Sequence, residues 1–122
     1  MNAVLWVLQA LLACAFLAAG GMHAAAPMAT LVAKMAWVAD APRWLPRFIG
    51  ALEMLGAIGL IVPMATGIAA WLTPLAAACL AAMMLLATVM HWVRAELSNG
   101  VPSAVLFLSC SLVAAVRVRL VP

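Results

Sequence analysis

The titratable side chains of this sequence are few, and they stand inside long apolar runs. Glu53 lies at the centre of RFIGALEMLGAIGLIVP, residues 47–63. In a helix that begins near residue 44, its carboxyl group would lie roughly 12 Å from the helix start, at 1.5 Å per residue. A charge at that depth in hydrocarbon is costly unless it is paired, hydrated or protonated. Glu53 therefore requires a partner or a proton.

Four candidate partners of Glu53 lie towards the same end of the predicted helices, and three of them come from other segments. His23 ends the first apolar segment, Arg47 begins the second, and His91 and Arg94 close the third. Arg47 is six residues from Glu53, which is not a same-face spacing, so we expect a neighbouring helix to supply the partner. We predict a polar cluster of these five residues. It either fixes the register of the helices or lines a pocket that handles a proton or a polar ligand.

Small residues accompany Glu53 at helical spacing. Gly50, Glu53, Gly56 and Gly59 recur at every third position. Such a stripe lets a second helix approach closely, and in lipid this packing is the main source of helix association. We predict that the three glycines pack against other helices and that Glu53 faces protein rather than hydrocarbon.

Metal and thiol chemistry are not expected. The two histidines stand on different segments, without HxxxH, HxxE or paired-carboxylate spacing, so we predict no metal site. Cys14, Cys79 and Cys110 fall on three segments and form no CxxC pair. In apolar surroundings they would stay as inert thiols and serve as small packing residues.

The composition shows which elements position these groups. Of 122 residues, 70% are hydrophobic and only 7% are charged, whereas soluble domains are about half apolar and about a quarter charged. The chain is therefore predicted to be an integral membrane protein in contact with a lipid bilayer. Its net charge of +3 comes from basic residues mostly near predicted helix ends, which suits lipid headgroups and gives no reason to expect a nucleic-acid partner.

Four apolar segments are long enough to cross a membrane, at about residues 3–22, 44–62, 68–92 and 101–120. Pro63 and Gly67 mark the second connection, and SNG at 98–100 marks the third. The segments lack period-2 alternation, so we expect helices rather than barrel strands. No Lys or Arg precedes the first segment, which favours a retained span over a signal peptide.

The predicted fold class is all-α, a transmembrane four-helix bundle forming one domain over residues 1–122. The connection between the first and second spans contains MATLVAKMAWVAD, residues 28–40, with apolar residues at helical spacing. We expect a short interfacial helix there, with an irregular loop as the alternative. The side holding both chain ends is called the near face, and the side holding the first and third connections is called the far face.

The order of these features resembles the DoxX-like family of small four-helix integral membrane proteins. The resemblance is carried by WLPRFIGALEMLGAIGLIVP in the second segment and LLATVMHWVR at the end of the third. A glycine followed three residues later by a polar residue, Gly20 and His23, ends the first segment. That element usually carries lysine in the family, so His23 departs from the pattern. The resemblance extends over nearly the whole chain and implies a protein of the bacterial cytoplasmic (inner) membrane.

The family includes subunits linked to quinone or thiol redox systems and, more distantly, eukaryotic membrane proteins that assist receptor assembly. The missing CxxC weakens the thiol connection. A quinone remains a candidate cofactor, because Glu53 or His91 would be able to hydrogen-bond a quinone carbonyl between apolar walls. Electrons would then come from a partner protein or another cofactor.

Three classes of function stay open, and whether the chain is an enzyme stays open with them. The first is a non-catalytic membrane subunit or assembly factor, which predicts an exposed small-residue or Met-rich face that docks a copy of the chain or another membrane protein. The second is a quinone-linked oxidoreductase component with a ligand near Glu53 and His91. The third is a small-solute permease, which charge-free near halves of the helices disfavour.

Overall fold

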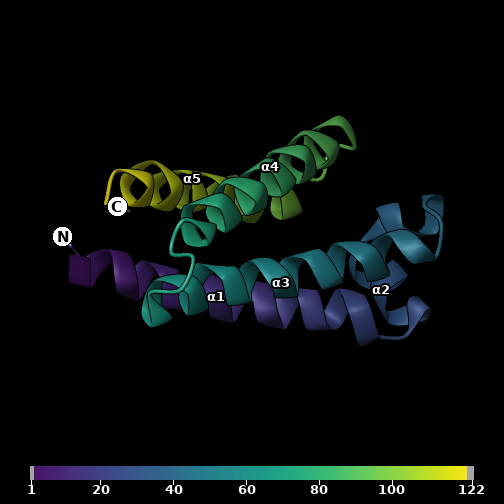
Figure 1. The fold of residues 1–122 in the computed structure, drawn as a ribbon. Helices are drawn as coiled ribbons and strands as arrows, with labels where there is room; N and C mark the ends of the chain where they lie inside the picture. Colours follow the sequence, from purple (N-terminus) through teal and green to yellow (C-terminus); the bar gives the residue numbers. More distant parts are fainter. Residues whose placement is uncertain (1, 121–122) are drawn as a thin grey trace.

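A computed structural model describes residues 2–120, and within that range the chain is helical with no strand. The elements are α1 (Asn2–Ala25), α2 (Met28–Lys34), the 3-10 helix η1 (Ala36–Asp40), α3 (Trp44–Thr66), α4 (Leu72–Val93) and α5 (Leu97–Leu120). The helices α1, α3, α4 and α5 are each long and apolar enough to cross a membrane. The predicted all-α bundle with four spans is confirmed (Figure 1).

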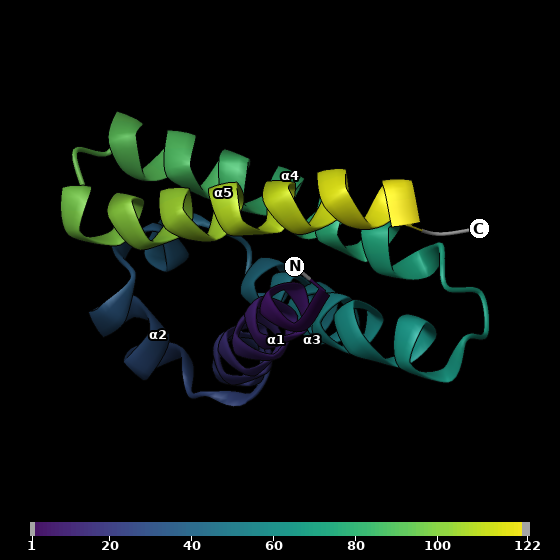
Figure 2. The ribbon, with the colours of Figure 1, turned by 90° about the vertical axis from the view of Figure 1, so that its left-hand side faces the viewer.

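The four long helices form two pairs. α1 packs along α3, and α4 packs along α5, while α3 also meets α4. Figures 1 and 2 show the pairs as two layers, and Figure 1 shows the start of α1 and the end of α5 at the same end of the molecule. That end is the near end, and the opposite end, which carries α2, is the far end.

An apolar core joins the two pairs at mid-height. It is built from fully buried side chains of all four long helices, among them Phe16, Leu60, Leu80 and Val113. The outer faces carry exposed Leu, Val and Ile side chains instead of polar ones. This inside-to-outside pattern is that of a protein whose solvent is lipid.

The connection between α1 and α3 is ordered rather than an irregular loop. The predicted short helix is present as two pieces, α2 and η1, which meet at Met35 in an extended conformation. Leu31, Trp37 and Val38 of this connection are buried and pack against residues of the long helices, which attaches the connection to the bundle. The segment therefore covers the far end, where the polar residues gather.

The second span does not end at Pro63, as the sequence indicated, because α3 continues through it to Thr66. Proline has no N–H to donate to the carbonyl four residues earlier, which here belongs to Gly59. The hydroxyl of Thr73 on α4 donates to that carbonyl at 2.9 Å. A neighbouring helix thus satisfies the carbonyl that Pro63 leaves unpaired, as the interior of a bilayer requires.

Two other boundaries also differ from the sequence-based ones. α4 begins at Leu72 rather than near residue 68, because the chain turns after Gly67, whose φ of 74° is left-handed. α5 begins at Leu97, so residues 98–100 lie in its first turn rather than in the connection. These shifts leave Arg94 and Glu96 in the short connection between α4 and α5.

Candidate functional site

The backbones of α1 and α3 come into contact at Gly20 and Gly50. A Cβ atom on Gly50 would lie 2.5 Å from the Gly20 carbonyl oxygen and 2.6 Å from the amide nitrogen of Ala24. Only glycine fits at such a distance. His23 follows Gly20 by three residues and Glu53 follows Gly50 by three, so the crossing places these two side chains together.

His23 and Glu53 form a short contact within the bundle. The His23 Nδ1 and Glu53 Oε1 atoms are 2.6 Å apart, and the two side chains are 12% and 3% exposed. The other ring nitrogen of His23 lies 3.2 Å from the sulfur of Met35. Arg47 donates to the His23 backbone carbonyl at 3.1 Å and not to Glu53. The structure therefore brings Glu53, His23 and Arg47 together, with His23 as the partner of the acid.

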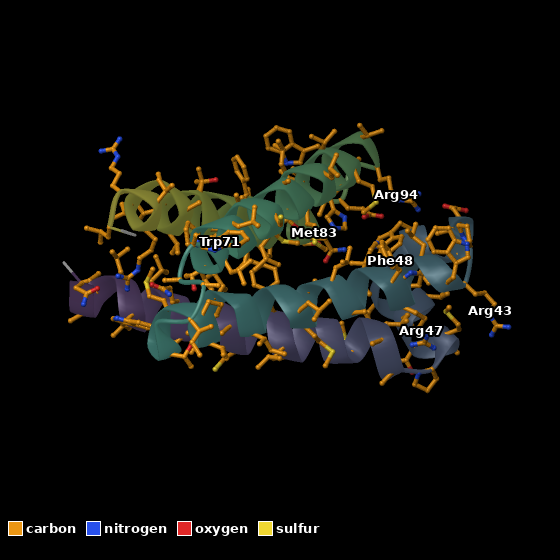
Figure 3. All side chains as sticks on the ribbon, viewed as in Figure 1. Arg43, Arg47, Phe48, Trp71, Met83 and Arg94 are labelled. Atoms are coloured by element: carbon orange, nitrogen blue, oxygen red, sulfur yellow. The ribbon has the colours of Figure 1, made fainter. Side chains whose placement is uncertain are left out.

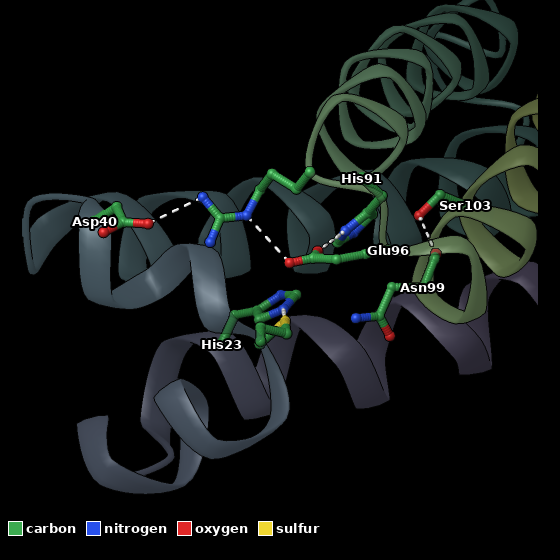
Figure 4. Close-up of polar contacts among 8 residues, drawn as sticks. His23, Asp40, His91, Glu96, Asn99 and Ser103 are labelled. Carbon is green, nitrogen blue, oxygen red and sulfur yellow. Dashed lines mark hydrogen bonds and ion pairs between the residues drawn. The ribbon is translucent and has the colours of Figure 1, made fainter.

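The predicted residues His91 and Arg94 contact a different acid. His91 Nδ1 lies 2.8 Å from Glu96 Oε2, and Arg94 Nε donates to Glu96 Oε1 at 3.1 Å. Arg94 also donates to Asp40 at 2.9 Å, which links the α4–α5 connection to η1 (Figure 4). Glu96 and Asp40 were not among the predicted site residues. Both lie at or just beyond helix ends, and nothing in their spacing indicates a contact with Arg94.

These two groups face each other at the far end. Figure 4 shows the His23 ring below the Glu96 side chain, with Asn99 directed into the space between them. Figure 3 shows Arg43, Arg47 and Arg94 at this end of the molecule, away from Trp71. We refer to His23, Glu53, His91, Arg94 and Glu96 as the far-end cluster.

Glu96 and Arg94 lie outside the spans, and each shifts the pKa of the other. The hydrogen bond from His91, followed by that from Arg94, lowers the pKa of Glu96 below its ordinary value. The hydrogen bonds to Glu96 and Asp40 raise the pKa of Arg94. Glu96 is thus a carboxylate at neutral pH, and because a carboxylate only accepts, Nδ1 of His91 carries the proton.

Among the carboxylate and imidazole atoms of the far-end cluster, two stay available for further hydrogen bonds. Oε2 of Glu53 and Nε2 of His91 have no partner among residues 2–120. In that range, Arg117 Nη2 is the one side-chain nitrogen or oxygen atom that is fully buried without a partner, so neither of these two atoms is fully buried. These two atoms therefore keep some access to the surroundings.

The glycine stripe divides between two neighbours. Gly50 contacts α1, whereas a Cβ on Gly56 would lie 2.6 Å from the Leu80 side chain and one on Gly59 would lie 2.7 Å from Ala76. The stripe thus packs against both α1 and α4. A Cβ on Gly21, beside Gly20, would have no neighbour within 4 Å, so Gly21 is not a packing residue.

A second polar group lies in the near half, where charge-free helices were expected; that expectation is wrong. Arg117 of α5 is only 3% exposed. Its Nε donates to Gln9 Oε1 at 2.6 Å, and Gln9 Nε2 donates to the Leu60 carbonyl at 2.6 Å. Arg117 Nη1 donates to Asn2, and the guanidinium carbon lies 5.0 Å from the centre of the Trp6 ring.

The sequence carried a signal for this group. Arg117 follows Cys110 and Val113 on one face of α5, and both of those residues are fully buried. Gln9 follows buried Leu5 by four residues on α1. A helical spacing of three or four residues from core positions places a polar side chain in the interior.

Two apolar grooves open on the outer surface. One, of about 840 Å³ between α4 and α5, is lined mostly by small residues, including Ala78, Ala82, Ser111 and Ala115. The other, of about 570 Å³ between α3 and α4, is lined by larger side chains such as Leu55 and Met83. Neither groove is lined by Glu53 or His91.

Metal-ligand and thiol groupings do not occur in the part of the chain that the structure describes. No three His, Cys, Asp or Glu residues between 2 and 120 are placed to share a metal ion. The three cysteines are free; Cys110 is in the core, whereas Cys14 and Cys79 are exposed on the outer surface. The expectation that all three act in packing therefore holds for Cys110 alone.

Comparison with known proteins gives one match. A family model described as the DoxX-like family matches residues 7–116, which include all four spans in whole or in large part. Comparisons with curated proteins and with solved structures gave no significant match.

Proposed function

The chain belongs to the DoxX-like family, and from this premise we propose that it is a non-catalytic membrane subunit or assembly factor that receives a transmembrane helix of a second polypeptide in the α4–α5 groove. The second polypeptide is a copy of this chain or another membrane protein.

The lining of the groove is the observation that supports this proposal. Ala78, Ala82, Ser111 and Ala115 leave the surface between α4 and α5 hollow. Small side chains let helix backbones approach, and the resulting packing drives helix association in lipid. Larger side chains would fill the same space and leave lipid tails as the only neighbours.

The exposure of α5 supports the same conclusion. Of the residues in the most apolar stretch of α5, 17% are buried in the bundle, whereas 28% to 39% are buried in the corresponding stretches of the other three spans. α5 packs along α4 and touches α1 only lightly. A span with so few internal neighbours is suited to take part in an intermolecular contact.

The far-end cluster has a structural part in this proposal. The His23–Glu53 contact holds α1 to α3, and the Arg94 contacts hold the α4–α5 connection to η1. Together they fix the two helix pairs relative to each other at one end. The contact between His91 and Glu96 joins the last turn of α4 to the residue before α5, and so helps to hold the far ends of the two helices that line the groove.

The other two functions have less support. A quinone ring beside Glu53 and His91 would need a space of its own, and both grooves lie elsewhere. A permease needs a continuous polar path, whereas the apolar core around Phe16 and Leu80 separates the far-end cluster from the Arg117 group.

Cysteine cross-linking in native membranes tests the proposal. In a background with the three natural cysteines replaced by alanine, Ala82→Cys and Ala115→Cys place thiols in the groove. Ala51→Cys, exposed on α3 outside both grooves, is the matched control. We expect a bifunctional thiol reagent to give adducts of defined mass from the groove positions, containing a peptide from a membrane-spanning segment.

The same positions supply the competing measurement. Ala82→Leu and Ala115→Leu fill the groove and should abolish the adduct formed from the other groove position, while Ala51→Leu should leave it unchanged. Equal adducts from all three cysteine positions, or adducts that persist when the groove is filled, would contradict docking in the groove.

A further inference from the structure

We infer that Arg117 binds a phosphate-type anion at the near membrane surface, and that an anionic phospholipid headgroup supplies it. This inference uses residues of the near half only and does not depend on the α4–α5 groove.

The hydrogen bonding of Arg117 is incomplete. A guanidinium has five N–H donors. Nε is used by Gln9 and Nη1 by Asn2, but Nη2 is fully buried and has no partner among residues 2–120. A buried donor without an acceptor is destabilising, and more so when it carries charge.

The charge of Arg117 is also uncompensated. The chain has three acidic side chains, Asp40, Glu53 and Glu96. All three are engaged at the far end, with Arg94, His23 and His91. The ligands that Arg117 has in the near half, Gln9 and Asn2, are neutral amides. No acidic side chain of this protein is available to neutralise it, so the counter-charge comes from outside the described chain.

The depth of Arg117 suits a lipid phosphate. It stands three residues before the end of α5 at Leu120, or about 4.5 Å along the helix axis. Trp6 lies against the guanidinium, and tryptophan favours the headgroup level of a bilayer. Arg119, exposed two residues further on, adds positive charge that attracts anionic lipid.

Asn2 is the part of this arrangement that an anion can replace. It is the exposed first residue of α1, and its side-chain oxygen accepts from Nη1. A phosphate that displaces this oxygen would accept from Nη1 and Nη2 together, in the two-point geometry that guanidinium groups offer to phosphate. The same step would supply both the missing acceptor and the missing negative charge.

Lipid binding to the purified full-length chain tests the inference. Native mass spectrometry from nanodiscs of phosphatidylcholine mixed with phosphatidylglycerol should show preferential retention of phosphatidylglycerol. We expect Arg117→Met to reduce that preference about tenfold, the loss of one charge-assisted contact. Arg119→Met, which removes an equal charge at an exposed position, should change it much less.

Stability measurements separate anion binding from a purely structural role. In phosphatidylcholine alone, Arg117→Met should unfold at the same or a higher denaturant concentration than wild type, because it removes a buried charge without a counter-charge. Phosphatidylglycerol should raise the unfolding midpoint of wild type and of Arg119→Met but not of Arg117→Met. Destabilisation of Arg117→Met in every lipid would overturn the inference.

A third measurement identifies the source of the anion. Inorganic phosphate added to the protein in phosphatidylcholine should leave the wild-type midpoint unchanged if the headgroup is the ligand. A phosphate effect that equals the phosphatidylglycerol effect and is lost in Arg117→Met would retain the anion site and refute the lipid as its source. No preference for phosphatidylglycerol in wild type, or a preference that survives in Arg117→Met, would overturn the site itself.

Discussion

Replacement of Gly50 by alanine tests whether the α1–α3 crossing positions the far-end cluster. The new methyl group would lie 2.5 Å from the Gly20 carbonyl oxygen and 2.6 Å from the Ala24 amide nitrogen. Both are backbone atoms, which cannot turn aside as the end of a flexible side chain can. The two helices must therefore separate.

The required separation follows from the same distances. Ordinary van der Waals contact begins near 3.4 Å, so relief of the 2.5 Å contact moves the backbones apart by about 0.9 Å. If His23 and Glu53 move with their helices, their 2.6 Å contact lengthens to about 3.5 Å, beyond a good hydrogen bond. Overpacking costs about 1–3 kcal/mol, and the weakened polar contact adds about 1 kcal/mol.

Gly21→Ala provides the matched control, because the added methyl group has nothing within 4 Å and lies in the same helix as Gly20. It should be neutral or stabilise the helix by about 0.5–1 kcal/mol. Reversible unfolding by sodium dodecyl sulfate in mixed micelles, followed by circular dichroism, measures both variants. Equal stability of Gly50→Ala and Gly21→Ala would refute the proposed role of the crossing.

Three further predictions concern the polar contacts. Glu53→Gln should destabilise the bundle by about 1–3 kcal/mol, and a double-mutant cycle with His23→Ala should show a coupling of about 1 kcal/mol or more; additive effects would contradict a direct contact. Thr73→Val should lower the stability of the wild-type bundle by about 0.6–2 kcal/mol. The loss should be much smaller in a Pro63→Ala background, because residue 63 then regains an N–H that can donate to the Gly59 carbonyl. The same loss in both backgrounds would contradict this account. The pKa of Glu96 lies below its ordinary 4.5, so the Glu96 carboxylate stabilises the fold above pH 4.5, and this stabilisation is lost as the pH falls through the lowered pKa. Wild type should therefore lose more stability than Glu96→Gln between about pH 6 and about pH 3. Parallel stability curves for the two proteins would contradict this prediction.

The sequence predicts the four spans well because their signal is strong and local. Long apolar runs bounded by turn residues identify each helix, whatever the neighbours are. The prediction that α3 ends at Pro63 was wrong for a non-local reason. Only the contact from Thr73, on the next helix, allows α3 to pass through the proline without an unpaired carbonyl. No pattern within α3 itself carries that information.

Four members of the far-end cluster were expected to lie in the same half of the bundle, whereas Glu96 and the pairing of the side chains were not predicted. Depth along each helix placed Glu53, His23, His91 and Arg94 in one half of the bundle, and that depends only on residue counting. Whether an acid meets one histidine or the other depends on which helices are neighbours. The chain pairs α1 with α3 through Gly20 and Gly50, so His23 of α1 contacts Glu53 while His91 of α4 contacts Glu96.

The two ends of the bundle differ in how their charges are balanced, and this difference has a consequence for stability. At the far end, the three acidic side chains contact His23, His91 and Arg94 of the same chain, so these contacts should depend little on the lipid. At the near end, Arg117 contacts only neutral amides and an aromatic ring, so its free energy depends on what the membrane supplies. Because helices in lipid gain little from the hydrophobic effect, a single buried charge is a large part of the balance. The α1–α5 contact, which is sparse beside the α1–α3, α3–α4 and α4–α5 contacts, should therefore be the part of the fold most sensitive to lipid headgroup charge.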